Sequence, residues 1–345
     1  VASHRRNFPG TAAFAVDLSN ETAKTLRRIA SLGSSEVDLI FGGPPCQGFS
    51  FGGRQDASDK RNLLIFEFAR LVIEFSPKYF VMENVKGLTS LRSRPVLNAF
   101  IRRIRRAGYH IVEPVQVLNA ADYGVPQRRQ RVFVIGYKAG LTAPQYPEPM
   151  SVRTSKGIPL TPTVRDAISD LPNLEDCSDL FETDTFSGDL RPASNEYARM
   201  MRSKSLPWRE MRQRKPVPGL SGCLRTLHAR EIVRRFRATP PGKTEPISRF
   251  IRLDWKGISP TLRAGTGPDH GGHTAPRPIH PERPRCITTR EAARLHSFPD
   301  WFSFHGTRWH DFRQIGNSVP PILAWVVASA CLGRTGPSNL SVRRV

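Results

Sequence analysis

The stretch VDLIFGGPPCQGFS, residues 37–50, joins a short apolar run to a loop that is rich in glycine and proline. Residues 37–41 predict a strand buried on both faces, as in a parallel sheet. In the loop that follows, two glycines permit a close backbone approach and two prolines stiffen the chain ahead of Cys46. A lone cysteine is often an inert buried residue. That reading leaves the flanking prolines and glycine unexplained, so we interpret Cys46 as a nucleophile.

Residues 37–138 alternate compact apolar runs with longer amphipathic ones. Two more strands are predicted at 79–82 and 131–137, and helices at 63–75 and 95–107. This alternation is typical of a parallel sheet with helical crossovers, so the predicted fold class is α/β with a doubly wound sheet. Further along, Thr288 and Glu291 have the spacing of a capping box ahead of a helix, and a last apolar helix is predicted from Pro321.

Two polar strings lie at the ends of predicted strands. ENV, residues 83–85, follows the second strand, and QRRQR, residues 127–131, leads into the third. Ligands bind where the strands of an open parallel sheet end, so we expect Glu83 near Cys46, where burial would raise its pKa and make it a proton donor. Alternation along QRRQR would place Arg129 and Arg131 on one face and Arg128 on the other. Taken alone, each string is equally compatible with solvated surface charge.

The charge of the chain indicates a polyanionic partner. Its 345 residues include 52 Lys and Arg against 30 Asp and Glu, a net charge of +22, which favours nucleic acid. Arginine supplies 42 of the 52 basic residues, which suits bidentate contacts to phosphate and guanine. Residues 191–294 hold 23 basic and 8 acidic residues. We therefore expect the electrostatic face of the chain to lie in this region.

Other classes of protein are disfavoured. The five cysteines are scattered and lack CxxC spacing, so neither a zinc site nor a disulfide framework is predicted, and a reducing compartment is indicated. His270 and His273 could suggest a metal, but without further ligands they are more typical of a hydrogen-bonding loop, and we expect no metal. The longest apolar stretch, residues 322–332, is too short to span a bilayer. We expect a cytoplasmic protein without membrane contact.

Four strings, in this order, resemble the motif series of the cytosine carbon-5 DNA methyltransferases: GGPPCQGFS (42–50), ENV (83–85), QRRQR (127–131) and QIGNSVPP (314–321). The resemblance covers residues 7–138 and 284–332 and extends to HRRNFPG (4–10) and REAARLHSFPDWF (290–302). It implies a Rossmann-like methyltransferase domain formed by 1–174 and 286–345, with a small DNA-reading domain, irregular or β-containing, inserted at 175–285. It also implies transfer of a methyl group from S-adenosylmethionine to carbon 5 of a flipped cytosine in double-stranded DNA. QIGNSVPP alone also predicts a proline-initiated helix start with an Asn-Ser cap.

The resemblance assigns roles to individual residues. Cys46 matches the nucleophile that adds to carbon 6, Glu83 the residue at ring nitrogen 3 and the amino group, and Arg131, helped by Arg129, the residue at the carbonyl oxygen on carbon 2. Residues 48–62 resemble a loop that closes over the flipped base. The residues matched to the cofactor site are Asp17, Leu18, Pro44, Leu64, Asn317, Ser318 and Val319. The residues expected at the DNA are Gln47, Ser50, Arg128, Thr261, Leu262 and Arg263.

One departure from the family pattern leaves alternatives open. The family opens with a strand and a Gly-rich loop for the methionine end of the cofactor, and no such loop precedes GGPPCQGFS here. We therefore expect a chain truncated by roughly 30 or more residues, about one strand-helix-strand unit, that binds cofactor poorly. The alternatives are a catalytically inactive DNA-binding remnant and a transfer-RNA cytosine methyltransferase. A monomer, with a cognate restriction endonuclease in the same cell, is also expected.

Overall fold

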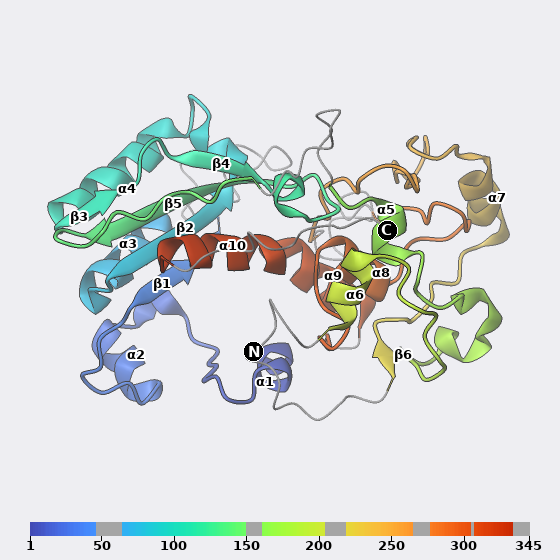
Figure 1. Ribbon diagram of the computed structural model, residues 1–345, viewed down its shortest axis with the longest axis horizontal. Helices are drawn as coiled ribbons and strands as arrows, with labels where there is room; N and C mark the ends of the chain where they lie inside the picture. Colours follow the sequence, from blue (N-terminus) through green and yellow to red (C-terminus); the bar gives the residue numbers. More distant parts are fainter. Residues whose placement is uncertain (46–63, 150–160, 204–218, 265–276, 305–306, 334–345) are drawn as a thin grey trace.

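The computed structural model describes residues 1–45, 64–149, 161–203, 219–264, 277–304 and 307–333 (Figure 1). Its helices and strands follow in chain order: α1 (Ala2–Asn7), α2 (Ala23–Ile29), β1 (Leu39–Gly42), α3 (Leu64–Phe75), β2 (Tyr79–Val85), α4 (Arg94–Arg106), β3 (Tyr109–Ile111), β4 (Gln116–Asn119), β5 (Gln130–Lys138), α5 (Val164–Ile168), β6 (Thr185–Phe186), α6 (Glu196–Arg202), β7 (Leu220–Ser221), α7 (Arg230–Ala238), α8 (Thr289–Leu295), α9 (Arg308–Asn317) and α10 (Pro321–Cys331).

The main sheet is mixed rather than parallel. Its strand order is β1-β2-β5-β3, and β4 also pairs with β5. β1 and β2 are parallel as predicted, but β5 runs antiparallel to β2, β3 and β4. The prediction that residues 131–137 form a third parallel strand was therefore wrong. The short strands β3 and β4 take the direction of β2, and the 3-10 turn Ala120–Tyr123 then reverses the chain into β5.

This reversal places the start of β5 beside the end of β2. Val85 pairs with Arg131, and Glu83 pairs with Phe133. The ENV string therefore belongs to β2 itself, whereas the sequence predicted that the strand ends at residue 82. The reason is that β5 continues the ladder through Val85 and so keeps these three residues extended.

Helices cover both faces of the sheet, as in a doubly wound fold. On one face, α3 and α4 pack against Phe80 and Met82 of β2. On the other face, α10 packs within the cluster that holds Val81 and Phe133. Because side chains alternate along a strand, Glu83 lies on the face of Val81, toward α10. The helices predicted at 63–75, at 95–107 and from Pro321 are confirmed, and α8 begins with the predicted capping box. The predicted Asn-Ser cap of the last helix is wrong, because Pro320 is the N-cap of α10, whereas Asn317 ends α9 and Ser318 is its C-cap.

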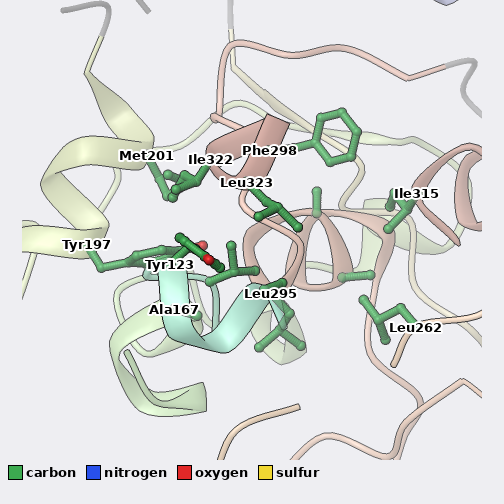
Figure 2. Packing of buried hydrophobic residues seen from close by; sticks show 14 of the residues in the cluster. Tyr123, Ala167, Tyr197, Met201, Leu262, Leu295, Phe298, Ile315, Ile322 and Leu323 are labelled. Carbon is green, nitrogen blue, oxygen red and sulfur yellow. The ribbon is translucent and has the colours of Figure 1, made fainter. Parts of the chain in front are cut away.

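Residues 175–285 form a less regular region. It contains the two-stranded sheet of β6 and β7, the basic helix α7, and Phe236 and Ile279, which form a small apolar cluster with Cys286 just beyond the region. Figure 1 places α7 at the opposite end of the molecule from β3. The main core nevertheless runs into this region and includes Leu262, Tyr197 and Met201 (Figure 2). The domain limits at 174 and 286 stay a prediction, since the apolar packing does not break there.

Among the described helices, none is both long enough and apolar enough to cross a membrane. The four cysteines of the described ranges, Cys177, Cys223, Cys286 and Cys331, are free thiols.

Candidate active site

An ion pair between β2 and β5 forms the centre of the candidate site. Arg131 Nε lies 2.9 Å from Glu83 Oε1, and each side chain is 16% exposed. The antiparallel register explains the pairing, because residues 83 and 131 are diagonal neighbours on one face of the two strands. A carboxyl group and a guanidinium group thus meet at the end of β2, and both remain partly accessible from solvent.

Burial and charge act in opposite directions on this pair. Burial raises the pKa of Glu83 above its ordinary value, whereas the charges of Arg131 and Arg129 lower it. Burial also lowers the pKa of Arg131, and Glu83 opposes that shift. The net rise for Glu83 was predicted from the sequence, and it allows the carboxyl group to hold a proton at higher pH than a solvated glutamate does.

The loop that leads to Cys46 lies against this pair. A Cβ atom at Gly43 would come within 3.1 Å of Glu83 Oε2, so the glycine allows the loop backbone to lie close to the Glu83 carboxyl group. Asn84 Nδ2 donates a hydrogen bond of 3.1 Å to the carbonyl oxygen of Pro44. These contacts hold the segment up to Pro45 over β2. Cys46, Gln47, Ser50 and residues 48–62 lie outside the described residues.

Arg129 and Arg128 point in different directions, as the alternation predicted. Arg129 is 1% exposed, whereas Arg128 is exposed. The guanidinium of Arg129 donates to three backbone carbonyl oxygens, those of Leu262 at 3.1 Å, Gly316 at 2.8 Å and Ser318 at 2.8 Å. Its buried Nε has no partner among the described residues. Burial lowers the pKa of Arg129 to about 9, with a further contribution from Arg131, so the group stays charged at neutral pH.

An apolar cavity of about 460 Å³ lies beside β1, within the size range of small-molecule sites. Three residues predicted at the cofactor, Leu18, Pro44 and Leu64, line it. The remaining wall is mostly apolar and aromatic, and the sequence did not predict a role at the cofactor for these residues: Leu26, Leu32, Val37, Ile40, Phe41, Gly42, Gly43, Pro45, Glu67, Phe68, Leu71 and Phe75. A signal existed in the apolar face of α3, where positions 64, 68, 71 and 75 recur at helical spacing.

The other predicted cofactor residues lie elsewhere in the described structure. Asp17 is exposed and caps a short 3-10 helix, where a hydrogen bond from the Ser19 side chain lowers its pKa. Asn317 ends α9, and Val319 packs against the main core. These residues and Ser318 are not among the residues that line the cavity.

A family model described as "C-5 cytosine-specific DNA methylase" matches residues 4–333. The chain belongs to this family. The enzyme is a DNA cytosine-5 methyltransferase, and the resemblance in the four strings is thereby confirmed.

Several relatives of this methyltransferase are named Type II methyltransferases. It is 47% identical to the Type II methyltransferase M.XorII of Xanthomonas oryzae pv. oryzae, over 94% of this chain and 75% of that protein. It is 33% identical to the Type II methyltransferase M.DdeI of Desulfomicrobium norvegicum, over 90% of this chain and 78% of that protein. A structure assigned as a DNA modification methyltransferase from an E. coli prophage superimposes with a TM-score of 0.75 at 32% identity, over 96% and 89% of the two chains.

The methyltransferase also contains two buried polar residues that the sequence reasoning passed over. Gln127 opens the QRRQR string, and His296 lies in the string at 290–302, yet neither received a role. Both are fully buried, and they contact each other. Their signal in the sequence was weak, since a single Gln or His in a motif is as easily explained by solvent exposure.

Proposed function

We propose that this methyltransferase transfers a methyl group from S-adenosylmethionine to carbon 5 of a cytosine flipped out of duplex DNA, through a covalent adduct with Cys46. The observation that carries the proposal is the Glu83–Arg131 pair, held against the loop segment that ends at Pro45. A carboxyl group with a raised pKa beside a guanidinium group suits a base that presents a ring nitrogen and a carbonyl oxygen together.

Each group has one role in the proposed sequence of steps. The Cys46 thiolate adds to carbon 6 of the ring, and Glu83 supplies a proton or hydrogen bond at nitrogen 3, where negative charge would otherwise build up. Arg131 donates hydrogen bonds to the carbonyl oxygen on carbon 2. The cofactor, when bound, supplies an electrophilic methyl group for carbon 5. Loss of the carbon 5 proton then re-forms the ring double bond and expels Cys46.

The residues around the apolar cavity fit the adenine part of the cofactor. Pro44 and Leu64 would pack against the ring, and Leu18 would close the cavity beside them. Glu67 is the acidic residue of the lining, and its carboxylate is already paired with Arg70 at 2.8 Å. The cavity thus offers apolar contact rather than charge. Roles for Asp17 and for residues 317–319 at the cofactor remain part of the proposal.

Contacts with DNA are proposed for the exposed residues near the site. Arg128 and Arg263 are exposed, and Thr261 is partly exposed, so each can reach a phosphate or a base edge. The Leu262 side chain is 2% exposed and lies in the main core, so we assign it a backbone role rather than a direct contact. We further infer that the enzyme acts as a monomer on sites shared with a cognate restriction endonuclease, which the Type II names of its relatives support.

A tritiated-methyl transfer assay on duplex DNA and on transfer RNA tests the proposal. We expect incorporation into duplex DNA, and loss of incorporation with retained DNA binding in Cys46→Ser. Cys177→Ser is the matched control, because Cys177 is a free and partly exposed thiol, and it should methylate as the parent does. Incorporation into transfer RNA alone would favour the alternative of a transfer-RNA cytosine methyltransferase. Incorporation into neither, with DNA still bound, would favour an inactive DNA-binding protein.

A further inference from the structure

Residues 126–128, just before β5, and the segment 259–262 lie side by side. The backbone N–H of Arg128 donates to the carbonyl oxygen of Ser259 at 2.8 Å, and the N–H of Ser259 donates to that of Pro126 at 2.9 Å. Thr261 Oγ1 donates to the carbonyl oxygen of Arg128 at 2.6 Å. A segment that the resemblance places at the DNA is therefore hydrogen-bonded to the residues that lead into β5, the strand that carries Arg131.

The Gln127 side chain lies beneath this contact and uses both ends of its amide. Its Oε1 accepts from the backbone N–H of Leu262 at 3.2 Å. Its Nε2 lies 2.9 Å from His296 Nδ1 and 3.3 Å from the carbonyl oxygen of Leu295. The residue is 0% exposed, so water cannot replace any of these partners. A buried amide with every partner supplied fixes the relative position of the groups it joins.

His296 extends the connection to the turn after α9. Its Nε2 lies 3.2 Å from the carbonyl oxygen of Ser318. Because a carbonyl oxygen only accepts, Nε2 carries the proton, and Nδ1 then accepts from Gln127 Nε2. Burial, together with the charges of Arg129 and Arg131, lowers the pKa of His296 well below its ordinary value. The neutral ring thus links Gln127 to Ser318, because it accepts a hydrogen bond from the first and donates one to the second.

Arg129 makes a second connection between the same two segments. Its guanidinium donates both to Leu262 and to Gly316 and Ser318 of the turn 316–318, which consists of the last two residues of α9 and the C-cap residue Ser318. The backbones also touch, because a Cβ atom at Gly316 would lie 2.1 Å from the Ala264 nitrogen. Segment 259–264 and turn 316–318 are therefore joined by two polar paths and by direct packing.

We propose that Gln127 and His296 are positioning residues that couple the DNA-reading segment 259–264 to the turn 316–318, so that binding of DNA and binding of the cofactor strengthen each other. The inference rests on the proposed function, which places the first segment at the DNA and the second at the cofactor. Neither residue needs to touch either ligand. The coupling must be reciprocal, because it is a single free energy shared by two binding events.

Gln127→Met tests the proposal, because methionine keeps the length of the side chain and removes both amide functions. The probe is S-adenosylhomocysteine, and the readout is the dissociation constant of duplex DNA with and without it. We expect the parent enzyme to bind DNA at least about fivefold more tightly with the probe, and Gln127→Met to show a ratio close to one. Val327→Ala, which weakens the core in α10 away from these contacts, should keep the parent ratio. A parent ratio of one, or a parent-like ratio in Gln127→Met, would overturn the proposal.

A pair of substitutions at His296 covers the case in which Gln127→Met does not fold. His296→Gln keeps an N–H for Ser318 and an acceptor for Gln127, so it should retain most of the coupling. His296→Leu removes both groups and should lose it, and equal coupling in the two variants would contradict the proposal. Methyl transfer by the parent enzyme is measured in the same samples. Methyl transfer without coupling between DNA binding and cofactor binding would refute this inference alone. Absence of methyl transfer would refute the proposed function.

Discussion

Gly316→Ala should destabilise the enzyme, although the same change in an ordinary helix interior is favourable. Gly316 lies in α9, where alanine normally gains about 1 kcal/mol over glycine. Here the added Cβ would lie 2.1 Å from the Ala264 nitrogen, 2.4 Å from the Arg263 carbonyl carbon and 2.6 Å from the Ala264 Cα. All three atoms are backbone, so no side chain can rotate away to make room.

The size of the effect follows from what must move. Reaching a van der Waals separation of ~3.5 Å requires segment 263–264 and α9 to part by more than about 1 Å. Overpacking of this kind costs about 1–3 kcal/mol. The separation would also stretch the Arg129 hydrogen bonds to Leu262 and Gly316, and each hydrogen bond to a charged group contributes about 1.5–3 kcal/mol. If stretching removes about half of the contribution of these two bonds, then after subtracting the gain in helix propensity we expect a net loss of about 1.5–5 kcal/mol.

Urea unfolding followed by circular dichroism measures this loss. Gly10→Ala serves as the control, because nothing lies within 4 Å of a Cβ built at Gly10, and its stability should stay within about 0.5 kcal/mol of the parent. Methyl transfer by Gly316→Ala should fall as well, since Arg129 and the DNA-reading segment shift together. A Gly316→Ala enzyme as stable as the parent would refute the close contact between α9 and segment 263–264.

Three other changes test the electrostatics of the site and of the core. If protonated Glu83 assists the reaction, single-turnover methyl transfer should decline as pH rises through its raised pKa. Arg131→Met should move that decline to higher pH because Arg131 lowers the pKa, and an unmoved profile would exclude Glu83 as the titrating group. Burial opposes ionisation of Glu291, yet Arg285 lowers its pKa from 4.5 to about 2. Ionised Glu291 should therefore contribute about 3 kcal/mol to the free energy of unfolding above pH 4.5, and this contribution should disappear as the pH falls toward 2. Acid unfolding of Glu291→Gln should not show this loss. DNA affinity should fall steeply with salt, and Arg263→Gln should reduce the slope of log K against log[salt] by about 0.9 if Arg263 contacts a phosphate; an unchanged slope would remove it from the interface.

The strand predictions succeeded where a strand is a compact apolar run, as in β1, β2 and β5, and failed where a short strand has mixed polarity. β2 and β5 stand out as runs of β-branched and aromatic residues, but β3 and β4 have three and four residues and mixed polarity. Without them, the hairpin between β4 and β5 cannot be seen, and β5 is given the wrong direction. The turn at Ala120–Tyr123, which ends at Gly124 in the left-handed region with φ of 81°, is the signal that was overlooked.

The paired residues of the candidate site were more predictable than the contacts that hold them. Short motifs were sufficient to assign Glu83 and Arg131 to one site, and the antiparallel pairing of β2 with β5 brings the two side chains together. The partners of Gln127 are 135 and 169 residues away along the chain. Whether a glutamine is buried among such distant groups depends on the complete packing, which no local pattern encodes.

The antiparallel direction of β5 explains why one short string can serve both chemistry and architecture. Because β5 begins at the end of β2, its first inward residue, Arg131, meets Glu83 diagonally across the ladder. Two residues earlier, the same alternation turns Arg129 inward just before the sheet, where it contacts the carbonyl oxygens of Leu262, Gly316 and Ser318. A parallel strand would begin at the opposite edge of the sheet and would carry both arginines away from Glu83. The reversal that the sequence did not predict is therefore the feature that brings the predicted residues together.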